Sequence, residues 1–191
     1  MTPWPAEVET AMRIPRLAAA LTLIIALAGT AGSRAEVLDS AAGGFTTRHS
    51  VEITASRLQV YRALVNDIRH WWNDDHTVSG SAANLSINAV VNGCFCETLG
   101  DGAGLAHMAI TFVNPGVMLK MTGGLGPLGL MGVAGNLTFE IDEADGVSTV
   151  VLQYAVGGYM PGGLDEIAPA VDGVLIDVLI CLKSFVEMDD E

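Results

Sequence analysis

GGLDEIAPAVDGVLIDVLICLKSFVEM, residues 162–188, predicts a long amphipathic helix. Its apolar residues recur at steps of three and four, which is the spacing of one helix face, and charged residues fall mostly between them. These apolar residues are Leu164, Ile167, Val171, Val174, Leu175, Val178, Leu182, Phe185 and Val186. Asp165 and Glu166 place negative charge at the helix start, where the helix dipole favours it, and Pro169 is early enough to be tolerated. A helix with so wide an apolar face must pack against another layer.

The chain before this helix is mostly strand-like. Residues 45–55 alternate as a first strand, and Ser56 with Gln59 has the pattern of a capping box. Helical spacing follows as far as Trp72 and breaks near Asn66 and Asp67, so one helix or two short ones are expected. Six further strands are expected over residues 85–91, 94–99, 105–113, 117–122, 136–142 and 148–156. The turn signals between them predict an antiparallel meander.

The more apolar side of each strand predicts the face that packs toward the last helix. The inward residues are expected to be Ile87, Ala89, Phe95, Met108, Ile110, Phe112, Leu119, Met121, Leu137, Phe139, Ile141, Leu152, Tyr154 and Val156. Residues 123–135, GGLGPLGLMGVAG, interrupt the pattern with glycines and exposed-looking leucines. This segment is either a loop tucked against the core or a lid over a cavity mouth.

The N-terminal part of the chain predicts export. Residues 12–35 carry Arg13 and Arg16, then an apolar run over residues 17–28, then small residues before a cut after Ala35 or Ala31. The run is shorter than the ~20 residues that a membrane span needs, so no stable span is expected after cleavage. The expected organisation is an N-terminal extension with signal peptide over residues 1–35, a tether over residues 36–44, and one folded domain over residues 45–188. The acidic residues before Met12 fit no signal, so either Met1 or Met12 is the start.

Composition argues against several partners and cofactors. The 191 residues carry a net charge of −13, which repels nucleic acid and anionic lipid surfaces. No phosphate-binding or dinucleotide motif and no Gly-x-Ser-x-Gly is present, so no cofactor is expected. The histidines have no metal-site spacing, and no metal site is expected.

Three cysteines raise the question of a disulfide in an exported protein. Cys94 and Cys96 would point to one face of an extended strand, where a direct bridge is strained. The expected bond therefore joins Cys181 to Cys94 or Cys96.

The element order resembles the START-like or SRPBCC superfamily. The strings that carry the resemblance are VEITASRLQVYRALVNDIRHWW (51–72), GCFCETLGDGAGLAHMAITFVNPGVML (93–119), GNLTFEIDEADGVSTVVLQY (135–154) and the closing helix. Within the superfamily the chain is similar to bacterial relatives of the heat-shock-chaperone ATPase activator and to the polyketide cyclase/dehydrase group. It departs from them in having Asn92 before Gly93, where paired glycines are usual, and Gly116, where a charged residue often follows proline.

The resemblance implies an α+β helix-grip fold, in which a curved seven-stranded antiparallel sheet wraps around a long C-terminal helix, with two short helices after the first strand. It also implies an apolar cavity between sheet and helix. Val171, Leu175, Val178 and Leu182 should then divide, some packing on the sheet and some lining the cavity.

The resulting hypothesis is an exported, secreted or periplasmic protein that binds a small hydrophobic molecule, lipid-like or polyketide-like. The residues expected to line the ligand site are Trp72, Phe95, Met108, Ile110, Leu119, Met121, Phe139, Leu152, Tyr154, Val171, Leu175 and Val178. An alternative is a cyclase/dehydrase-like enzyme that uses Glu97 and His107 for proton transfer. If Glu97 shares the inward face of Phe95, desolvation would raise its pKa and suit it to acid or base chemistry; a register slip of one would put it on the surface. A weaker alternative is a co-chaperone or protein-interaction role.

Overall fold

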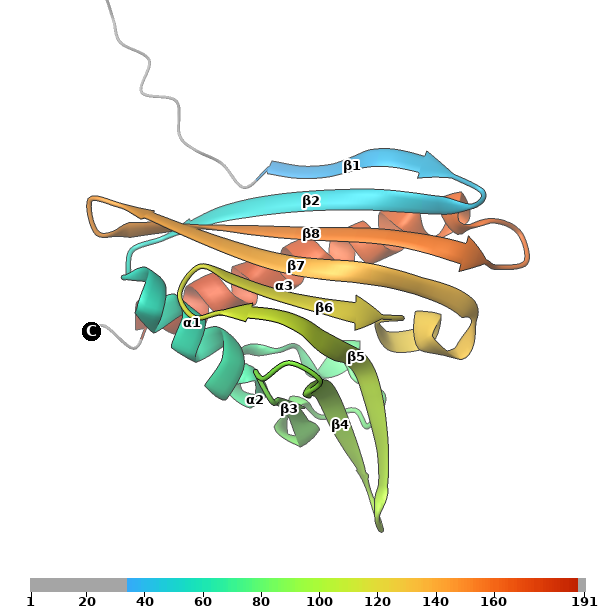
Figure 1. Ribbon diagram of the computed structural model, residues 1–191, viewed down its shortest axis with the longest axis horizontal. Coiled ribbons are helices and arrows are strands. Elements are labelled where there is room, and N and C mark those ends of the chain that lie inside the picture. The colour runs from blue at the N-terminus through green and yellow to red at the C-terminus, as the bar shows by residue number, and fades with distance from the viewer. Residues whose placement is uncertain (1–33, 189–191) are drawn as a thin grey trace, which may run out of the picture. The chain divides into compact units, whose positions relative to one another are not determined.

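The computed structural model describes residues 34–188 of the chain. The expected signal segment up to residue 33, and the choice between Met1 and Met12, lie outside these residues. One antiparallel sheet of eight strands forms the first layer, and the long helix α3 lies across one of its faces (Figure 1). The elements, in chain order, are β1 (Arg34–Ala41), β2 (Gly44–Ile53), α1 (Arg57–Asn66), α2 (Ile68–Trp71), η1 (Asp74–His76), η2 (Ala82–Asn84), β3 (Leu85–Ile87), β4 (Cys94–Gly100), β5 (Ala103–Asn114), β6 (Met118–Gly123), η3 (Gly126–Leu130), β7 (Gly132–Ala144), β8 (Val147–Tyr159), η4 (Leu164–Glu166) and α3 (Ala168–Met188).

The strands follow the order β1-β2-β8-β7-β6-β5-β4-β3. From β3 to β8 each strand pairs with the next in the chain, and β8 then pairs with β2. The predicted α+β fold, with a long C-terminal helix on the sheet, is confirmed; the two short helices follow two N-terminal strands, where the prediction had one. Asp145 and Gly146 both have positive φ, at 52° and 79°, as a two-residue hairpin turn requires. Asp101 and Gly102 connect β4 to β5 in the same way, with φ of 51° and 82°.

The prediction of a tether over residues 36–44 is wrong. Most of this segment belongs to β1, which pairs with β2 from Arg34 opposite Ser50 to Ala41 opposite Gly44. An edge strand is held by backbone hydrogen bonds on one side, so it does not need the apolar alternation that the segment lacks. The described sheet therefore has eight strands where seven were expected. A signal cut after Ala35 would divide β1, whereas a cut after Ala31 would leave it whole.

The short helices begin and break where the sequence indicates. The Ser56 hydroxyl accepts from the backbone N–H of Gln59 at 3.4 Å, and the Gln59 side chain accepts from the backbone N–H of Ser56 at 3.0 Å. This capping box starts α1, and the break between Asn66 and Ile68 separates α1 from α2.

The apolar face of α3 divides along its length. Leu175, Val178, Leu179, Leu182 and Val186 are buried and pack in the core beneath the sheet. At the start of the helix, Val171 and Val174 are only partly buried, as is Ile167, which directly precedes it. At the other end, Glu187 accepts hydrogen bonds from Lys183 Nζ at 2.6 Å and from the backbone N–H of Thr54 at 3.0 Å, which joins the helix to the end of β2.

Two features of the sheet differ from the predicted alternation. The register of β5 against β6 shifts between Ile110 and Phe112, so Phe112 is 46% exposed and does not face inward as predicted. The third strand stops at Ile87, and the segment that follows folds back on itself before β4. A Cβ at Gly93 would lie 2.0 Å from the carbonyl oxygen of Asn88, so this close approach requires glycine.

The predicted disulfide is also wrong. Cys94 is bonded to Cys96, and Cys181 is a free, partly buried thiol on α3. Residues two apart on a regular strand lie ~6.5 Å apart. The Cα atoms of Cys94 and Cys96 are 5.4 Å apart, within the range that a disulfide spans, at a point where the β4–β5 register shifts. The local contraction of the strand is what makes the short bridge possible.

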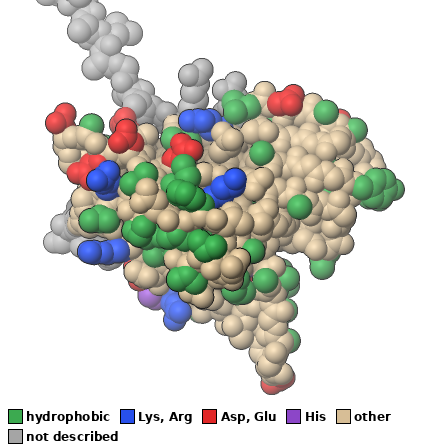
Figure 2. Space-filling view, viewed as in Figure 1, with side chains coloured by type: hydrophobic (Ala, Val, Ile, Leu, Met, Phe, Trp, Pro, Cys, Tyr) green, Lys and Arg blue, Asp and Glu red, His purple; other side chains and the backbone are tan. Residues whose placement is uncertain are grey.

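The outer face of the sheet carries mixed side chains. Figure 2 shows acidic, basic and hydrophobic groups interspersed on this face, without a broad field of one sign. The net charge of −13 is therefore not gathered there as a single acidic patch.

Candidate functional site

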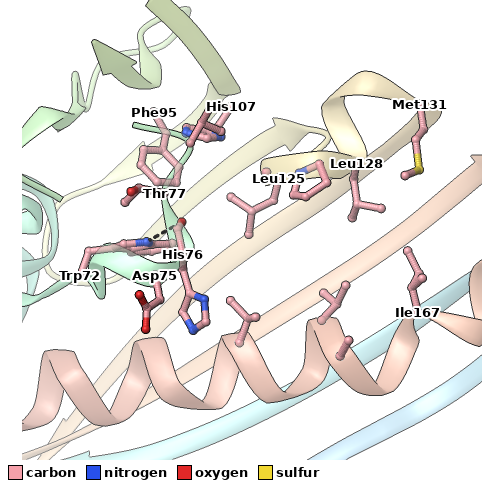
Figure 3. A pocket seen from close by; sticks show the side chains of 16 residues that line it. Trp72, Asp75, His76, Thr77, Phe95, His107, Leu125, Leu128, Met131 and Ile167 are labelled. Carbon is pink, nitrogen blue, oxygen red and sulfur yellow. Dashed lines mark hydrogen bonds between the residues drawn. The ribbon is translucent and has the colours of Figure 1, made fainter. Parts of the chain in front are cut away.

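A cavity of about 400 Å³ lies at the N-terminal half of α3 (Figure 3). Its walls come from the loop after α2, from strands β4 and β5, from the segment around η3, and from α3 itself. The lining residues are Trp72, Asp75, His76, Thr77, Val78, Phe95, His107, Leu125, Gly126, Pro127, Leu128, Met131, Ile167, Ala170, Val171 and Val174. Most of these side chains are apolar, and none of them is Lys or Arg.

Aromatic rings form one wall of the cavity. The ring centroids of Trp72 and Phe95 are 5.3 Å apart in an edge-on arrangement, and those of Phe95 and His107 are 5.0 Å apart. Trp72 Nε1 donates to the carbonyl of His76 at 3.1 Å, which fixes the loop after α2 against the ring. Trp71 instead is buried in the core, where its Nε1 donates to the carbonyl of Ala63 at 2.9 Å. Only the second tryptophan of the pair lines the cavity.

The glycine-rich segment over residues 123–135 forms the opposite wall. Leu125, Leu128 and Met131 line the cavity from this segment. Tyr154 holds it in place, because its hydroxyl accepts from the backbone N–H of Leu125 at 3.1 Å and donates to the carbonyl of Gly123 at 3.3 Å. Burial raises the pKa of Tyr154, so the phenol keeps its proton and its donor role. The sequence left open a loop tucked against the core or a lid over a cavity mouth; the structure places this segment in a wall of the cavity.

Glu97 faces the interior on the same side of β4 as Phe95, and both are 1% exposed. Its carboxylate accepts hydrogen bonds from the backbone N–H groups of Val78, at 3.0 Å, and Ser79, and it contacts His107 Nε2 at 2.9 Å. Burial raises the pKa of this carboxyl, but the hydrogen bonds from Ser79, Val78 and His107 outweigh burial and lower the pKa to about 2. The expectation of a raised pKa is therefore wrong, since Glu97 is ionised and anchors the loop at the cavity edge.

His107 reaches the interior because of a β-bulge. Phe95 pairs with Met108, but Cys96 pairs with Ala106, which leaves His107 as the extra residue on β5. His107 and Met108 are consecutive yet both are buried, whereas regular alternation would expose one of them. The bulge therefore brings the imidazole to Glu97 and to the cavity wall.

Two cavity-lining residues of the loop after α2, Asp75 and His76, have titratable side chains. His76 Nε2 is 3.3 Å from Asp177 Oδ2, and Asn73 Nδ2 donates to the same oxygen at 3.1 Å. These contacts connect the loop after α2 to the helix. Asp75 lines the cavity next to them.

A second buried histidine lies away from the cavity. His49, on the inner face of β2, is 1% exposed, and its Nε2 is 3.0 Å from Asp172 Oδ1 on α3. Burial lowers the pKa of His49, although the carboxylate of Asp172 acts in the opposite direction. Neither residue lines the cavity.

The predicted ligand residues fall into two groups. Trp72, Phe95 and Val171 line the cavity. The others pack in the core and do not line it; they are Met108, Ile110, Leu119, Met121, Phe139, Leu152, Tyr154, Leu175 and Val178. These residues form one packed core in which no space is left for a ligand, and the cavity lies beside the first turns of α3.

The prediction missed the loop after α2 and, apart from Val171, the residues at the start of α3 that line the cavity. The sequence signal for the loop was weak, because Asp75, His76 and Thr77 look like an ordinary polar connection. Ile167, just before α3, and Val174 on it were recognised as apolar but were not assigned to the cavity.

Within residues 34–188 no group of three or more His, Cys, Asp or Glu side chains is placed to hold a metal ion. No helix in the described part of the chain is both long and apolar enough to cross a membrane.

Comparison with known proteins gives structural matches. No model of a protein family and no curated protein matches the chain. An uncharacterised protein from Rhizobium leguminosarum has 18% identity and a TM-score of 0.57 over 82% of this chain and 98% of its own. The Aha1 dimer from Colwellia psychrerythraea has 17% identity and a TM-score of 0.53 over 74% and 96% of the two chains. DynU16, a protein of the dynemicin biosynthetic locus, has 17% identity and a TM-score of 0.52 over 74% of this chain and 47% of its own.

At these identities the matches establish the fold alone. The resemblance inferred from the sequence is confirmed at that level: the chain is structurally similar to Aha1-like and other SRPBCC proteins and has their helix-grip-like fold.

Proposed function

We propose that the protein binds a small hydrophobic molecule in the cavity at the start of α3. The observation that carries the proposal is the cavity itself, which has a volume of about 400 Å³ and mostly apolar walls. Burying ~300 Å² of ligand surface at ~25 cal/mol/Å² would contribute ~7 kcal/mol before the costs of association. A useful affinity therefore needs few polar contacts.

We also propose that this binding takes place after export to the periplasm or the cell exterior. The support is the sequence of residues 12–35, in which Arg13 and Arg16 precede an apolar run and small residues. Native mass spectrometry of the protein recovered from the exported fraction would test both proposals. A chain that begins near residue 32 or 36 and retains a small apolar molecule is expected. An uncleaved chain would contradict export, and a chain free of ligand that also fails to enhance a hydrophobic dye would contradict binding.

Filling the cavity should abolish binding without unfolding the protein. Val171→Trp places an indole in the space that the ligand would occupy, so the affinity for a hydrophobic fluorescent dye is expected to fall at least tenfold. Ile180→Trp is the matched control, because Ile180 is on the same helix but 47% exposed. Dye titration of both variants, with circular dichroism to verify folding, is the measurement. Equal loss in both variants, or in neither, would place the dye site elsewhere.

A second candidate function is proton-transfer catalysis of the cyclase/dehydrase kind. The observation that favours it is a buried histidine oriented by an ionised carboxylate, at 2.9 Å, on a cavity wall. The chain is also structurally similar to DynU16, a protein of a biosynthetic locus, and this similarity supports a catalytic role. In this reaction Glu97 stays ionised and positions the ring, and His107 is the base. This assignment replaces the expectation that both residues exchange protons.

The catalytic proposal predicts exchange of protons next to a carbonyl group. For 2-acetylnaphthalene in D₂O, His107 would remove a methyl proton to form the enolate. The imidazolium N–H would exchange with D₂O, and the ring would then return a deuteron to the same carbon. Wild-type protein is expected to accelerate this exchange at least tenfold, and His107→Phe is expected not to, while still binding the probe. His70→Phe, on the exposed side of α2, is the control. Exchange followed by mass spectrometry that is no faster than in buffer, at concentrations where the probe is bound, would remove this candidate.

A further inference from the structure

Only one ring nitrogen of His107 has a partner. Nε2 lies 2.9 Å from Glu97 Oε2, while Nδ1 is buried and makes no hydrogen bond with any residue of the described chain. The whole residue is 5% exposed and its ring belongs to the cavity wall. A buried acceptor or donor without a partner is uncommon in folded proteins, and this one belongs to a residue that lines the cavity.

The contacts of Glu97 determine which nitrogen carries the proton. An ionised carboxylate only accepts hydrogen bonds, and Glu97 already accepts from the backbone N–H groups of Val78 and Ser79. Nε2 of His107 must therefore be a donor. In the neutral imidazole this leaves Nδ1 without a hydrogen and with a lone pair free to accept. The pKa of Glu97, lowered to about 2, is consistent with a carboxylate that is ionised at neutral pH.

The surroundings of His107 limit the charge of a ligand. Among the described residues no Lys or Arg lines the cavity, whereas Asp75 does, and the lining histidines His107 and His76 each contact a carboxylate, Glu97 and Asp177. An anionic head group would be desolvated there without a counter-ion, which is strongly unfavourable. An uncharged hydroxyl that donates to Nδ1 has no such cost.

The aromatic wall of the cavity limits the shape of a ligand. Phe95 lies between Trp72 and His107, with centroid separations of 5.3 Å and 5.0 Å, so flat ring surfaces form this wall of the cavity. A planar aromatic ring can stack on these surfaces while its hydroxyl reaches the histidine.

We propose that the cavity selects an uncharged, largely aromatic molecule with one hydroxyl, and that this hydroxyl donates a hydrogen bond to Nδ1 of His107. This inference rests on the proposed binding function and adds the chemical class of the ligand. His107 is the residue that sets specificity, and Glu97 positions it.

Four fluorescent probes of nearly equal shape test the proposal. 1-Hydroxypyrene can donate to Nδ1; 1-methoxypyrene cannot; pyrene lacks the polar group; and pyrene-1-carboxylate adds a negative charge. The wild-type protein is expected to bind 1-hydroxypyrene about tenfold more tightly than 1-methoxypyrene, the factor that one buried hydrogen bond gives. The carboxylate is expected to bind most weakly.

Variants and spectroscopy identify the residue responsible. His107→Phe should remove the preference for 1-hydroxypyrene and keep pyrene binding, whereas His70→Phe should retain the preference. Nitrogen-15 NMR of the wild-type protein should show Nδ1 of His107 without a hydrogen, with a resonance that shifts on addition of 1-hydroxypyrene but not of 1-methoxypyrene. This measurement does not depend on the folding of any variant.

The outcomes separate the two proposals. Equal binding of hydroxy- and methoxypyrene, preferred binding of the carboxylate, or a hydrogen on Nδ1 would overturn the inference while leaving apolar ligand binding intact. Failure of every probe to bind would overturn the proposed function and the inference with it.

Discussion

Replacing Glu97 by Gln is expected to lower the free energy of unfolding by roughly 3 kcal/mol at pH 7 and by much less near pH 2. The carboxyl has a pKa of about 2 in the folded protein against an ordinary value of 4.5. A pKa that is lowered on folding contributes stability above the unfolded value, and this contribution disappears as pH falls through the folded value. The window of the effect is therefore about pH 4.5 to 2. The amide side chain of the variant keeps one acceptor oxygen but also brings an NH₂ group toward the donors that the carboxylate satisfied.

Guanidinium unfolding of wild type and variant, at intervals from pH 2.5 to pH 7, measures this effect. The difference between the two proteins should shrink as the pH falls. Glu140→Gln, on the exposed face of β7, is the control and should change stability by no more than about 0.5 kcal/mol at any pH. Parallel stability curves for wild type and Glu97→Gln would show that the ionised carboxylate does not contribute in the way its hydrogen bonds imply.

The regular parts of the fold could be predicted because their signals are local. The periodicity of α3, the capping box at Ser56 and the turn at Asp145 each act within a few residues of the chain. Once the strands and the helix are assigned, the antiparallel meander follows from the short connections. The inward position of Glu97 followed from the alternation of β4.

The candidate site could not be predicted to the same extent, because bulges and loops build it. Alternation predicts the facing of a strand residue only while the register is unbroken, and the shift opposite Phe95 turns His107 inward. No residue type marks that bulge in the sequence. The same shift accompanies the Cys94–Cys96 bond, which regular strand geometry argues against.

The position of the cavity depends on packing between distant segments. Strands β7 and β8 place large side chains such as Phe139 and Tyr154 beneath the sheet, and these fill the space that the resemblance assigned to ligand. The open volume remains where the glycine-rich segment and the loop after α2 meet the first turns of α3. Apolar character alone does not distinguish a residue that packs from one that lines a cavity.

Truncating the side chain of Leu182 on α3 to alanine is expected to cost about 2–5 kcal/mol of stability, because Leu182 is fully buried and its removal leaves a cavity in the core. A matched pair one turn apart on the same helix tests the division of its apolar face. Val178 is 1% exposed and packs in the core, whereas Val174 lines the cavity and is only partly buried. Val178→Ala should therefore cost about 1.5–3 kcal/mol, and Val174→Ala less than about 1 kcal/mol.

The same substitutions should affect ligand affinity in the opposite order from stability. Val174→Ala removes contacts from the cavity wall and is expected to change the affinity for 1-hydroxypyrene by severalfold, while Leu182→Ala and Val178→Ala leave it within about twofold in the folded state. Chemical unfolding and fluorescence titration of the three variants measure both properties. If Val174→Ala destabilises the protein as much as Val178→Ala does, the first turns of α3 close a packed core and the cavity is not an open binding space. If the costs separate as expected, one helix stabilises the sheet with its C-terminal half and shapes the ligand site with its N-terminal half.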